Sequence, residues 1–137
     1  MGSNSPKLLA VIVAAILHWL LGAVWFITLK QQWLAGLGTT SEQLMARGIP
    51  AWLPHVVTLI ANLLLAYVIG WVILATGSQT LLRGIGVAAF LWLGIAASVF
   101  ATELVFEAKS LEFFCIVAGY PLVGMMIMGA VLGAWKK

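Results

Sequence analysis

The sequence predicts an all-α membrane protein: an antiparallel bundle of four transmembrane helices, with a short interfacial helix between the first and the second. Composition is the first observation, since 64% of the 137 residues are hydrophobic and only 8% are charged. A soluble domain carries about 25% charged residues, which cover its surface with groups that water solvates. The second observation is four apolar stretches, each near the roughly 20 residues that cross a hydrocarbon core. Thirdly, two of their connections are short, which makes neighbouring helices antiparallel.

The four predicted spans cover residues 8–29, 55–76, 81–106 and 111–135. The first contains His18 as its one ionisable residue, and it is longer than the apolar region of a cleaved signal sequence. The third has an uncharged centre between Arg83 and Glu103, and the fourth follows after the short connection "VFEAKSLE". The sequence shows no internal repeat and no low-complexity segment. Residues 1–137 are therefore expected to form a single integral membrane domain.

The connection between the first and second spans is long and carries a helix signal of its own. Thr39 followed by Glu42 has the form of a capping box, which predicts a short helix that continues to about Arg47. Trp33 and Trp52 flank this segment, and tryptophan is enriched at the membrane–water interface. The short helix is therefore expected to lie on the membrane surface.

Basic residues near the ends of the spans predict the orientation of the bundle. Four lie on the side that both termini share with the middle connection, and three lie on the opposite side. The two groups are Lys7, Arg83, Lys136 and Lys137, and Lys30, Arg47 and Lys109. We therefore expect a multi-pass protein of the bacterial cytoplasmic (inner) membrane with both termini in the cytoplasm. The long connection then marks the outer end of the bundle.

In this orientation nearly every polar side chain of the spans falls in the outer half of the bundle. A polar atom in hydrocarbon costs several kcal/mol unless it is satisfied, so these groups should face one another or a solvated cavity. Two interpretations stay open: the groups satisfy each other and water, or they line a cleft that accepts a ligand. The candidate ligand-binding residues are Glu103, His55, Asn62, Tyr120, Trp25 and Thr102.

Glutamates are concentrated in the segment "FATELVFEAKSLEFF", the corner between the third and fourth spans. Glu107 and Glu112 are expected to belong to a solvated corner, where Ser110 starts the fourth helix. Glu103 lies one turn further into the membrane, on the helix that also carries Thr102. Glu103 is therefore the carboxylate that we predict to be part of a site, facing the bundle rather than lipid.

Other chemistries find no support in the sequence. No run of lysine or arginine is present, so we expect no nucleic-acid partner. His18 lies roughly 16 Å deeper than His55, so the two cannot share one metal ion. His55 with Glu103 and Glu107 lacks the second His or Cys that zinc sites usually have. His18 is instead expected to form a hydrogen bond between helices. With no nucleophile–base pair visible, we expect no catalytic residue, no metal, no cofactor and no enzymatic activity.

Small residues in the fourth span predict close helix packing. Gly129 and Gly133 form a small-xxx-small pattern that lets two backbones approach each other. The neighbour is expected in the same chain, with a membrane protein partner or a second copy of the chain as the alternative. Membrane lipids are the other expected partners.

Two segments resemble a known family. "GAVWFITLKQQW" (22–33) is similar to a Gly-x-x-Trp-Tyr…Lys-x-Trp segment, and residues 104–135 are similar to a Phe-Glu…Ser-Leu…Ala-Gly-Tyr-His…Met-Gly-x-x-Leu-Gly-x-Trp ending. Both patterns are those of domain-of-unknown-function family 1761, small four-helix bacterial integral membrane proteins. Ile27 and Thr28 stand where the family usually has Ser-Pro or Gly-Pro, and Pro121 stands where it usually has histidine. The resemblance implies the four-helix fold and no particular activity.

The sequence therefore predicts a binding or accessory protein without catalytic activity. Its polar cleft in the outer half would hold a small amphipathic or lipid-like ligand, or the protein would dock beside a partner membrane subunit. The alternative is a proton- or cation-coupled transporter or channel that uses Glu103 and His55. Transporters usually have more helices, with broken helices or inverted repeats that this sequence lacks. We therefore favour the binding function.

Overall fold

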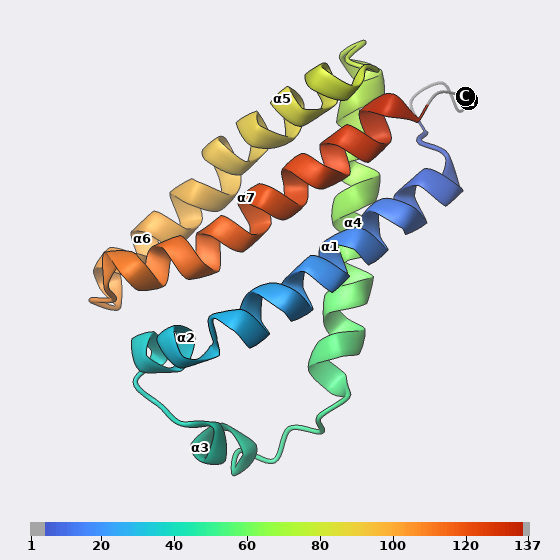
Figure 1. Cartoon of the computed structure of the whole chain (residues 1–137). Helices are drawn as coiled ribbons and strands as arrows, with labels where there is room; N and C mark the ends of the chain where they lie inside the picture. Colours follow the sequence, from blue (N-terminus) through green and yellow to red (C-terminus); the bar gives the residue numbers. More distant parts are fainter. Residues whose placement is uncertain (1–4, 136–137) are drawn as a thin grey trace.

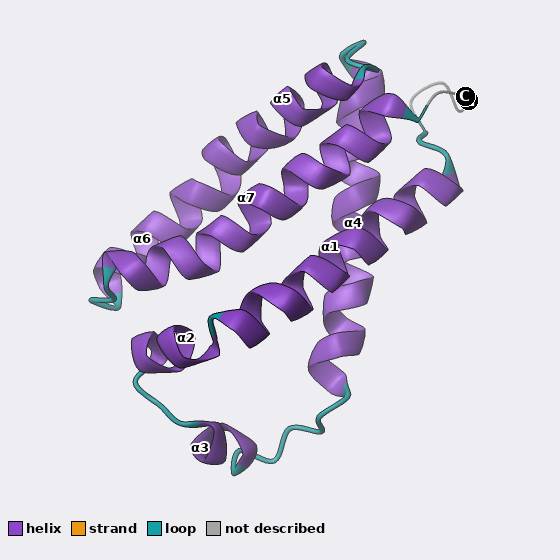
Figure 2. Ribbon diagram, viewed as in Figure 1, coloured by secondary structure: helices purple, strands orange, loops and turns teal. Residues whose placement is uncertain are grey.

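The computed structural model describes residues 5–135, and every regular element in that range is a helix (Figures 1 and 2). Four helices are long and apolar enough to cross a membrane: α1 (Leu8–Thr28), α4 (Leu53–Ala75), a third helix over Leu81–Phe106 and α7 (Leu111–Ala134). The predicted all-α bundle of four spanning helices is confirmed. Each of these helices begins and ends within two residues of the range expected for its span.

The third helix is one continuous rod whose geometry changes in its middle. It consists of α5 (Leu81–Leu91), a π-helical turn (Trp92–Ala97) and α6 (Ser98–Phe106). A π-helical turn widens the backbone hydrogen-bond ladder, which leaves carbonyl groups open to side-chain donors. The hydroxyl of Ser98 donates to the carbonyl of Gly94 at 3.0 Å. No signal in the sequence predicted this turn.

Helix α7 lies at the centre of the bundle (Figure 1). It packs against α5, α1 and α4, and it is the most buried of the four spanning helices. Helices α1 and α4 also pack on each other, and consecutive spanning helices run in opposite directions (Figure 1). We call the end of the bundle with the turn between α6 and α7 the loop end. The opposite end, where α1 begins and α7 ends, is called the terminal end.

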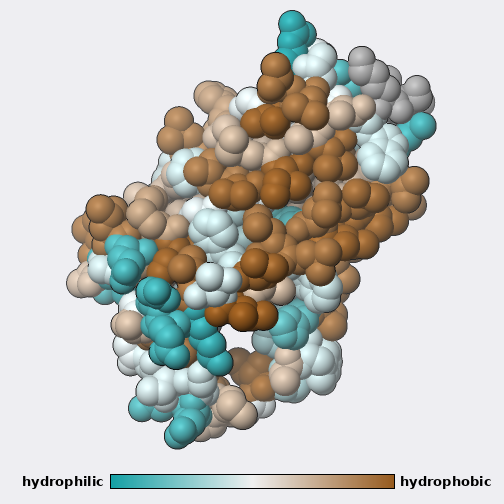
Figure 3. All heavy atoms as spheres, viewed as in Figure 1, coloured by the Kyte–Doolittle hydropathy of each residue, from teal (hydrophilic) through white to brown (hydrophobic). Residues whose placement is uncertain are grey.

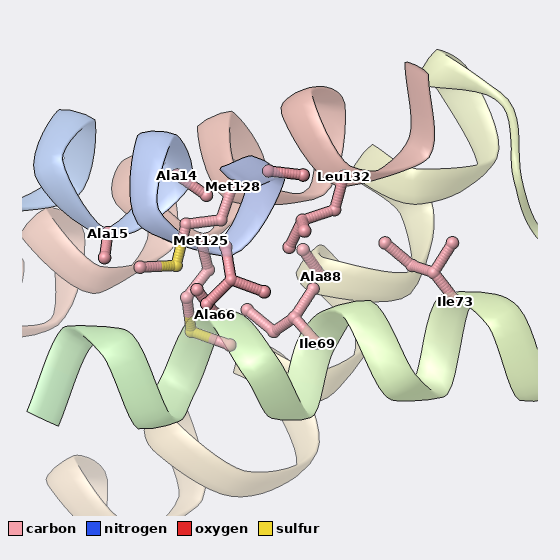
Figure 4. Close-up of a cluster of buried hydrophobic side chains, with 11 residues drawn as sticks. Ala14, Ala15, Ala66, Ile69, Ile73, Ala88, Met125, Met128 and Leu132 are labelled. Atoms are coloured by element: carbon pink, nitrogen blue, oxygen red, sulfur yellow. The ribbon is translucent and has the colours of Figure 1, made fainter. Parts of the chain in front are cut away.

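The core where α1, α4, α5 and α7 meet consists largely of small and flexible side chains (Figure 4). Ala14, Ala66 and Ala88 are fully buried there, together with Ile69 and Met128. Alanine lets neighbouring helices approach closely, and methionine fills the irregular space that remains between them. Van der Waals packing of this kind is what holds helices together in a bilayer, because lipid tails are as apolar as the side chains.

Helices α5 and α7 touch through glycines. A Cβ at Gly129 would overlap the backbone carbonyl of Gly84, and a Cβ at Gly133 would overlap the carbonyl of Thr80. Both glycines of the predicted small-residue pattern are therefore in contact with a neighbour in the same chain. A second copy of the chain could use this face only if α5 separated from α7.

The predicted interfacial helix between the first and second spans is instead two short helices. Helix α2 (Lys30–Leu37) follows α1 after a break at Leu29, and it lies against α7, where Leu34 is buried. A capping side chain is the signal that marks the start of a new helix in a sequence. Because α2 begins without one, the sequence did not predict it.

Helix α3 (Ser41–Met45) begins with a capping box one residue later than predicted. The Thr40 hydroxyl accepts a hydrogen bond from the N–H of Gln43 at 3.2 Å, and the Gln43 side chain accepts one from the N–H of Thr40 at 3.3 Å. The predicted pair of Thr39 and Glu42 was therefore wrong by one residue. Helix α3 has no buried residue, and Figure 3 shows an opening between this segment and the bundle.

Apolar side chains cover the middle of the molecule, and polar ones gather at the loop end (Figure 3). Large exposed hydrophobic residues occur on every spanning helix, for example Leu17, Leu64, Phe90 and Val123. Such a surface is stable in contact with lipid tails and not with water. The chain is therefore a multi-pass membrane protein.

Candidate functional site

The six predicted ligand-binding residues do not share one cleft. Three are buried or partly buried between helices, and three are exposed. The first group is Asn62, Tyr120 and Trp25, and the second is His55, Thr102 and Glu103. The structure therefore divides the predicted site into an internal cluster and separate positions on the surface.

The internal cluster consists of His18, Asn62 and Tyr120, and it joins α1, α4 and α7. Within residues 5–135, the buried polar side chains are His18 and Asn62, with 3% and 5% of their surface exposed. The Tyr120 hydroxyl lies 2.7 Å from Nδ1 of His18 and 3.1 Å from the backbone carbonyl of the same residue. The predicted hydrogen bond between His18 and another helix is confirmed. Its partner is Tyr120, which sequence reasoning had placed in the ligand cleft.

Two glycines make room for this pair. A Cβ at Gly22 on α1 would lie 2.8 Å from the Tyr120 hydroxyl oxygen, and a Cβ at Gly124 on α7 would overlap the His18 ring. Each helix thus carries a glycine opposite the polar ring of the other. Among residues 5–135, Nε2 of His18 and Nδ2 of Asn62 find no hydrogen-bond partner, although the Asn62 side chain approaches the Tyr120 hydroxyl. The cluster is a close-fitting joint between helices.

Two indoles support α7 beside its proline. Trp25 donates a hydrogen bond from Nε1 to the carbonyl of Ile116, and Trp92 donates one to the carbonyl of Ala118, both at 2.9 Å. These carbonyls lie one turn before Pro121, which has no backbone N–H to donate within the helix. Helix α7 continues through Pro121. Trp25, a predicted ligand residue, therefore makes a structural hydrogen bond in this molecule.

His55 and Thr102 have partners other than those expected. The indole of Trp19 donates to the backbone carbonyl of His55 at 3.2 Å, while the His55 side chain is exposed. The Thr102 hydroxyl donates to the carbonyl of Ser98 in its own helix at 3.0 Å. Ser98 and Thr102 thus form hydrogen bonds within their own helix and not with a polar side chain of another helix. A hydroxyl in a helix can bond to the backbone one turn earlier, and no second helix is then needed.

The turn between α6 and α7 is fixed by hydrogen bonds. Ala108 has a left-handed backbone (φ 54°), and the N–H of Lys109 donates to the carbonyl of Leu104 at 3.0 Å. This Schellman-type ending is followed by Ser110, whose hydroxyl caps α7 by accepting from the N–H of Phe113 at 3.1 Å. The turn thereby positions Lys109, whose Nζ lies 5.6 Å from the centre of the Phe113 ring.

A groove runs between α6 and α7 beside this turn, and we call it the corner groove. It is a shallow surface groove, because the roughly 220 Å³ of space beside it includes the open surroundings. Two carboxylates, one ammonium group and five apolar side chains line it: Glu103, Glu107, Lys109, Phe100, Leu104, Phe113, Phe114 and Val117. Charges of both signs therefore lie next to an apolar wall, an arrangement that suits an amphipathic molecule.

The corner groove changes the expected roles of the glutamates. Glu103 lines it and is exposed, whereas the sequence led us to expect that Glu103 faces the interior of the bundle. Glu107 lines the same groove, although it was assigned to the solvated corner. Glu107 lies four residues after Glu103, and this spacing places both side chains on one face of a helix. The spacing could therefore have predicted that the two glutamates belong to one site. Glu112 is not among the lining residues.

His55 and Glu103, the two residues of the transport alternative, lie on helices that do not pack closely on each other. Helix α4 packs on α1, α7 and α5 and has no substantial contact with α6. In the part of the chain that the structure describes, no three His, Cys, Asp or Glu side chains come together to hold a metal ion.

The chain was compared with models of known protein families. The profile of a family described as "Protein of unknown function (DUF1761)" matches residues 9–133, which is nearly the whole chain. The chain therefore belongs to this family. No curated protein and no solved structure shows significant similarity to it.

Proposed function

We propose that this protein is a non-catalytic binding or accessory protein of the bacterial inner membrane, which holds an amphipathic, lipid-like ligand in the corner groove. The observation that carries the proposal is the groove itself, where charged groups of both signs lie beside Phe100, Phe114 and Val117. Charged parts of a ligand would bind at the turn, and its apolar part would lie against the aromatic wall. The groove lies at the ends of two spanning helices, where lipid headgroups meet hydrocarbon.

In this proposal the internal cluster is not the binding site. Its role is structural, because it joins α1 to α7. His18 and Tyr120 bond to each other, and the close contacts at Gly22 and Gly124 leave no space between their helices. The joint holds α7 against α1, and α7 forms one wall of the corner groove. A wall that is already in place lowers the entropy cost of binding a ligand.

The transport alternative has weaker support. It requires Glu103 and His55 as successive positions of a proton or cation, and these residues belong to helices without substantial contact. Within residues 5–135, the core between the two ends of the bundle is apolar apart from the single cluster of His18, Asn62 and Tyr120. One isolated cluster does not form a continuous polar pathway for an ion.

We propose that both termini lie in the cytoplasm, on the basis of the four-to-three distribution of basic residues about the spans. The loop end, with the corner groove, would then face the outer leaflet of the membrane. Lipid of that leaflet would be the ligand that reaches the groove without crossing the bilayer.

The test of the proposed function is the lipid that the full-length protein retains in mild detergent, measured by native mass spectrometry. Val117→Trp should fill the groove and retain less lipid than the wild type, because the indole occupies the apolar wall. Val123→Trp is the matched control, since Val123 lies on the same helix, is 37% exposed and does not line the groove. Leu104→Trp fills the groove from α6 and serves if Val117→Trp does not fold. Equal retention by the wild type and a folded groove-filling variant would refute the proposal.

A further inference from the structure

We propose that the ligand of the corner groove is a phospholipid whose headgroup ends in a primary ammonium, a lipid of the phosphatidylethanolamine class. This inference rests on the proposed function and names the ligand class for the same groove. Its basis is the order of charges along the turn: carboxylates on α6, then the ammonium of Lys109, then the start of α7. A headgroup of this class carries an ammonium and a phosphate separated by two carbons, so it can match both charges.

The α6 side of the groove suits a primary ammonium. Glu103 and Glu107 are one helical turn apart, and two carboxylates at this spacing repel each other unless a cation lies between them. Glu107 is also the C-terminal cap of α6, where the helix dipole adds partial negative charge. A primary ammonium offers three N–H donors to these carboxylates, whereas the quaternary ammonium of phosphatidylcholine offers none.

The α7 side of the groove suits the phosphate. Lys109 lines the groove, and the turn hydrogen bond between its N–H and the carbonyl of Leu104 fixes its backbone. The next residue, Ser110, is the N-cap of α7, whose N-terminal end carries the partial positive charge of its dipole. Glu112 in the first turn of α7 carries the opposite charge, but it does not line the groove, so Lys109 is the group that would bind the phosphate. The negative end of α6 and the positive end of α7 therefore run in the same order as the ammonium and phosphate of one headgroup.

The apolar wall identifies the source of the headgroup as a lipid rather than a free small molecule. Phe100, Phe114 and Val117 continue from the charged turn along α6 and α7 toward the middle of the bundle. An acyl chain would follow this wall and contribute burial of apolar surface that a free headgroup lacks.

The experiment measures which lipid the purified full-length protein binds from mixed micelles. The micelles contain equal amounts of phosphatidylethanolamine, phosphatidylcholine and phosphatidylglycerol with identical acyl chains, and native mass spectrometry counts the bound species. Both lipids carry a cationic headgroup, so the difference lies in the N–H donors of the primary ammonium, and one net hydrogen bond predicts a roughly fivefold preference for phosphatidylethanolamine over phosphatidylcholine. The combined variant Glu103→Gln/Glu107→Gln should lose this preference, and Glu112→Gln, outside the groove, should keep it. Lys109→Gln should weaken binding of all three lipids, because they share the phosphate.

The outcomes separate this inference from the proposed function. If the wild type binds phosphatidylethanolamine and phosphatidylcholine equally while Val117→Trp loses lipid, the groove binds lipid and the inference about the headgroup is wrong. Preferential binding of phosphatidylglycerol would overturn it as well, since Lys109 would then dominate over the carboxylates. If Val117→Trp binds as much lipid as the wild type, the proposed function and the inference both fail.

Discussion

The hydroxyl of Tyr120 on α7 lies 2.7 Å from Nδ1 of His18 on α1, and the two rings are 4.6 Å apart between centres. Within the described residues this pair joins two spanning helices through side chains in the middle of an otherwise apolar contact. A polar side chain in hydrocarbon that found no partner would cost far more than the hydrogen bond contributes. The pair therefore favours one rotation of α1 and α7 relative to each other.

Tyr120→Phe should lower the free energy of unfolding by about 1 kcal/mol, because it removes an interhelical hydrogen bond and leaves Nδ1 of His18 without a partner. Tyr67→Phe is the control, since Tyr67 is 43% exposed on α4. Denaturant unfolding in detergent micelles, followed by circular dichroism, measures the difference. Equal stability of the two variants would show that the hydrogen bond does not stabilise the bundle.

Gly124→Ala should destabilise the protein by about 1–3 kcal/mol, the usual cost of overpacking, because the new methyl group overlaps the His18 ring. Gly86→Ala should not destabilise it, because a Cβ at Gly86 meets no neighbour and alanine is the better helix former. The same unfolding measurement compares both variants with the wild type.

A double-mutant cycle tests the cause of that loss. In a His18→Ala background the ring is absent, so Gly124→Ala should cost less than it does in the wild type. An unchanged cost would mean that the space opposite Gly124 is limited by something other than His18.

Gly129→Leu should prevent folding of the bundle, because any side chain at this position overlaps the backbone of Gly84 on α5. Gly94→Leu is the matched control on the third helix, where a Cβ meets no neighbour within 4 Å. The yield of monodisperse protein on size exclusion in detergent is the measurement. A normal yield and normal melting of Gly129→Leu would rule out the close contact between α5 and α7.

A reporter that is active only in the periplasm should be inactive when fused after Lys137 and active when inserted near Gly38. The reason is the excess of basic residues on the side of the termini. The reverse pattern would place the corner groove at the cytoplasmic leaflet. It would leave the groove and its chemistry unchanged, and the lipid of the other leaflet would become the ligand.

The sequence by itself determined the four spanning helices and their approximate ends, because the length of an apolar stretch is a local property. A capping side chain adds a second local signal at the start of α7, where Ser110 caps the helix. The sequence also indicated the contact of Gly129 and Gly133 with a neighbouring helix, since small residues at this spacing serve one purpose in a membrane. The break at Leu29 was not predictable in this way, since no local breaker marks it. The π-helical turn at Trp92–Ala97 contains Gly94, but a single glycine inside a helical pattern is tolerated and does not indicate a change of helix type.

Only the tertiary structure decided which polar residues meet. His18 and Tyr120 are 102 residues apart, and their contact depends on how α1 and α7 are rotated about their axes. Gly22 and Gly124 favour that rotation, because each leaves room for a ring on the opposite helix. The sequence does not reveal this role, since it does not show which side chain lies opposite each glycine. Likewise Glu103 lies in the corner groove with Glu107 and Lys109 because the turn at Ala108 lays α6 against α7. The length of a hydrophobic stretch predicts that a helix crosses the membrane, but it does not determine the rotation of that helix about its axis. Packing against the neighbouring helices determines the rotation.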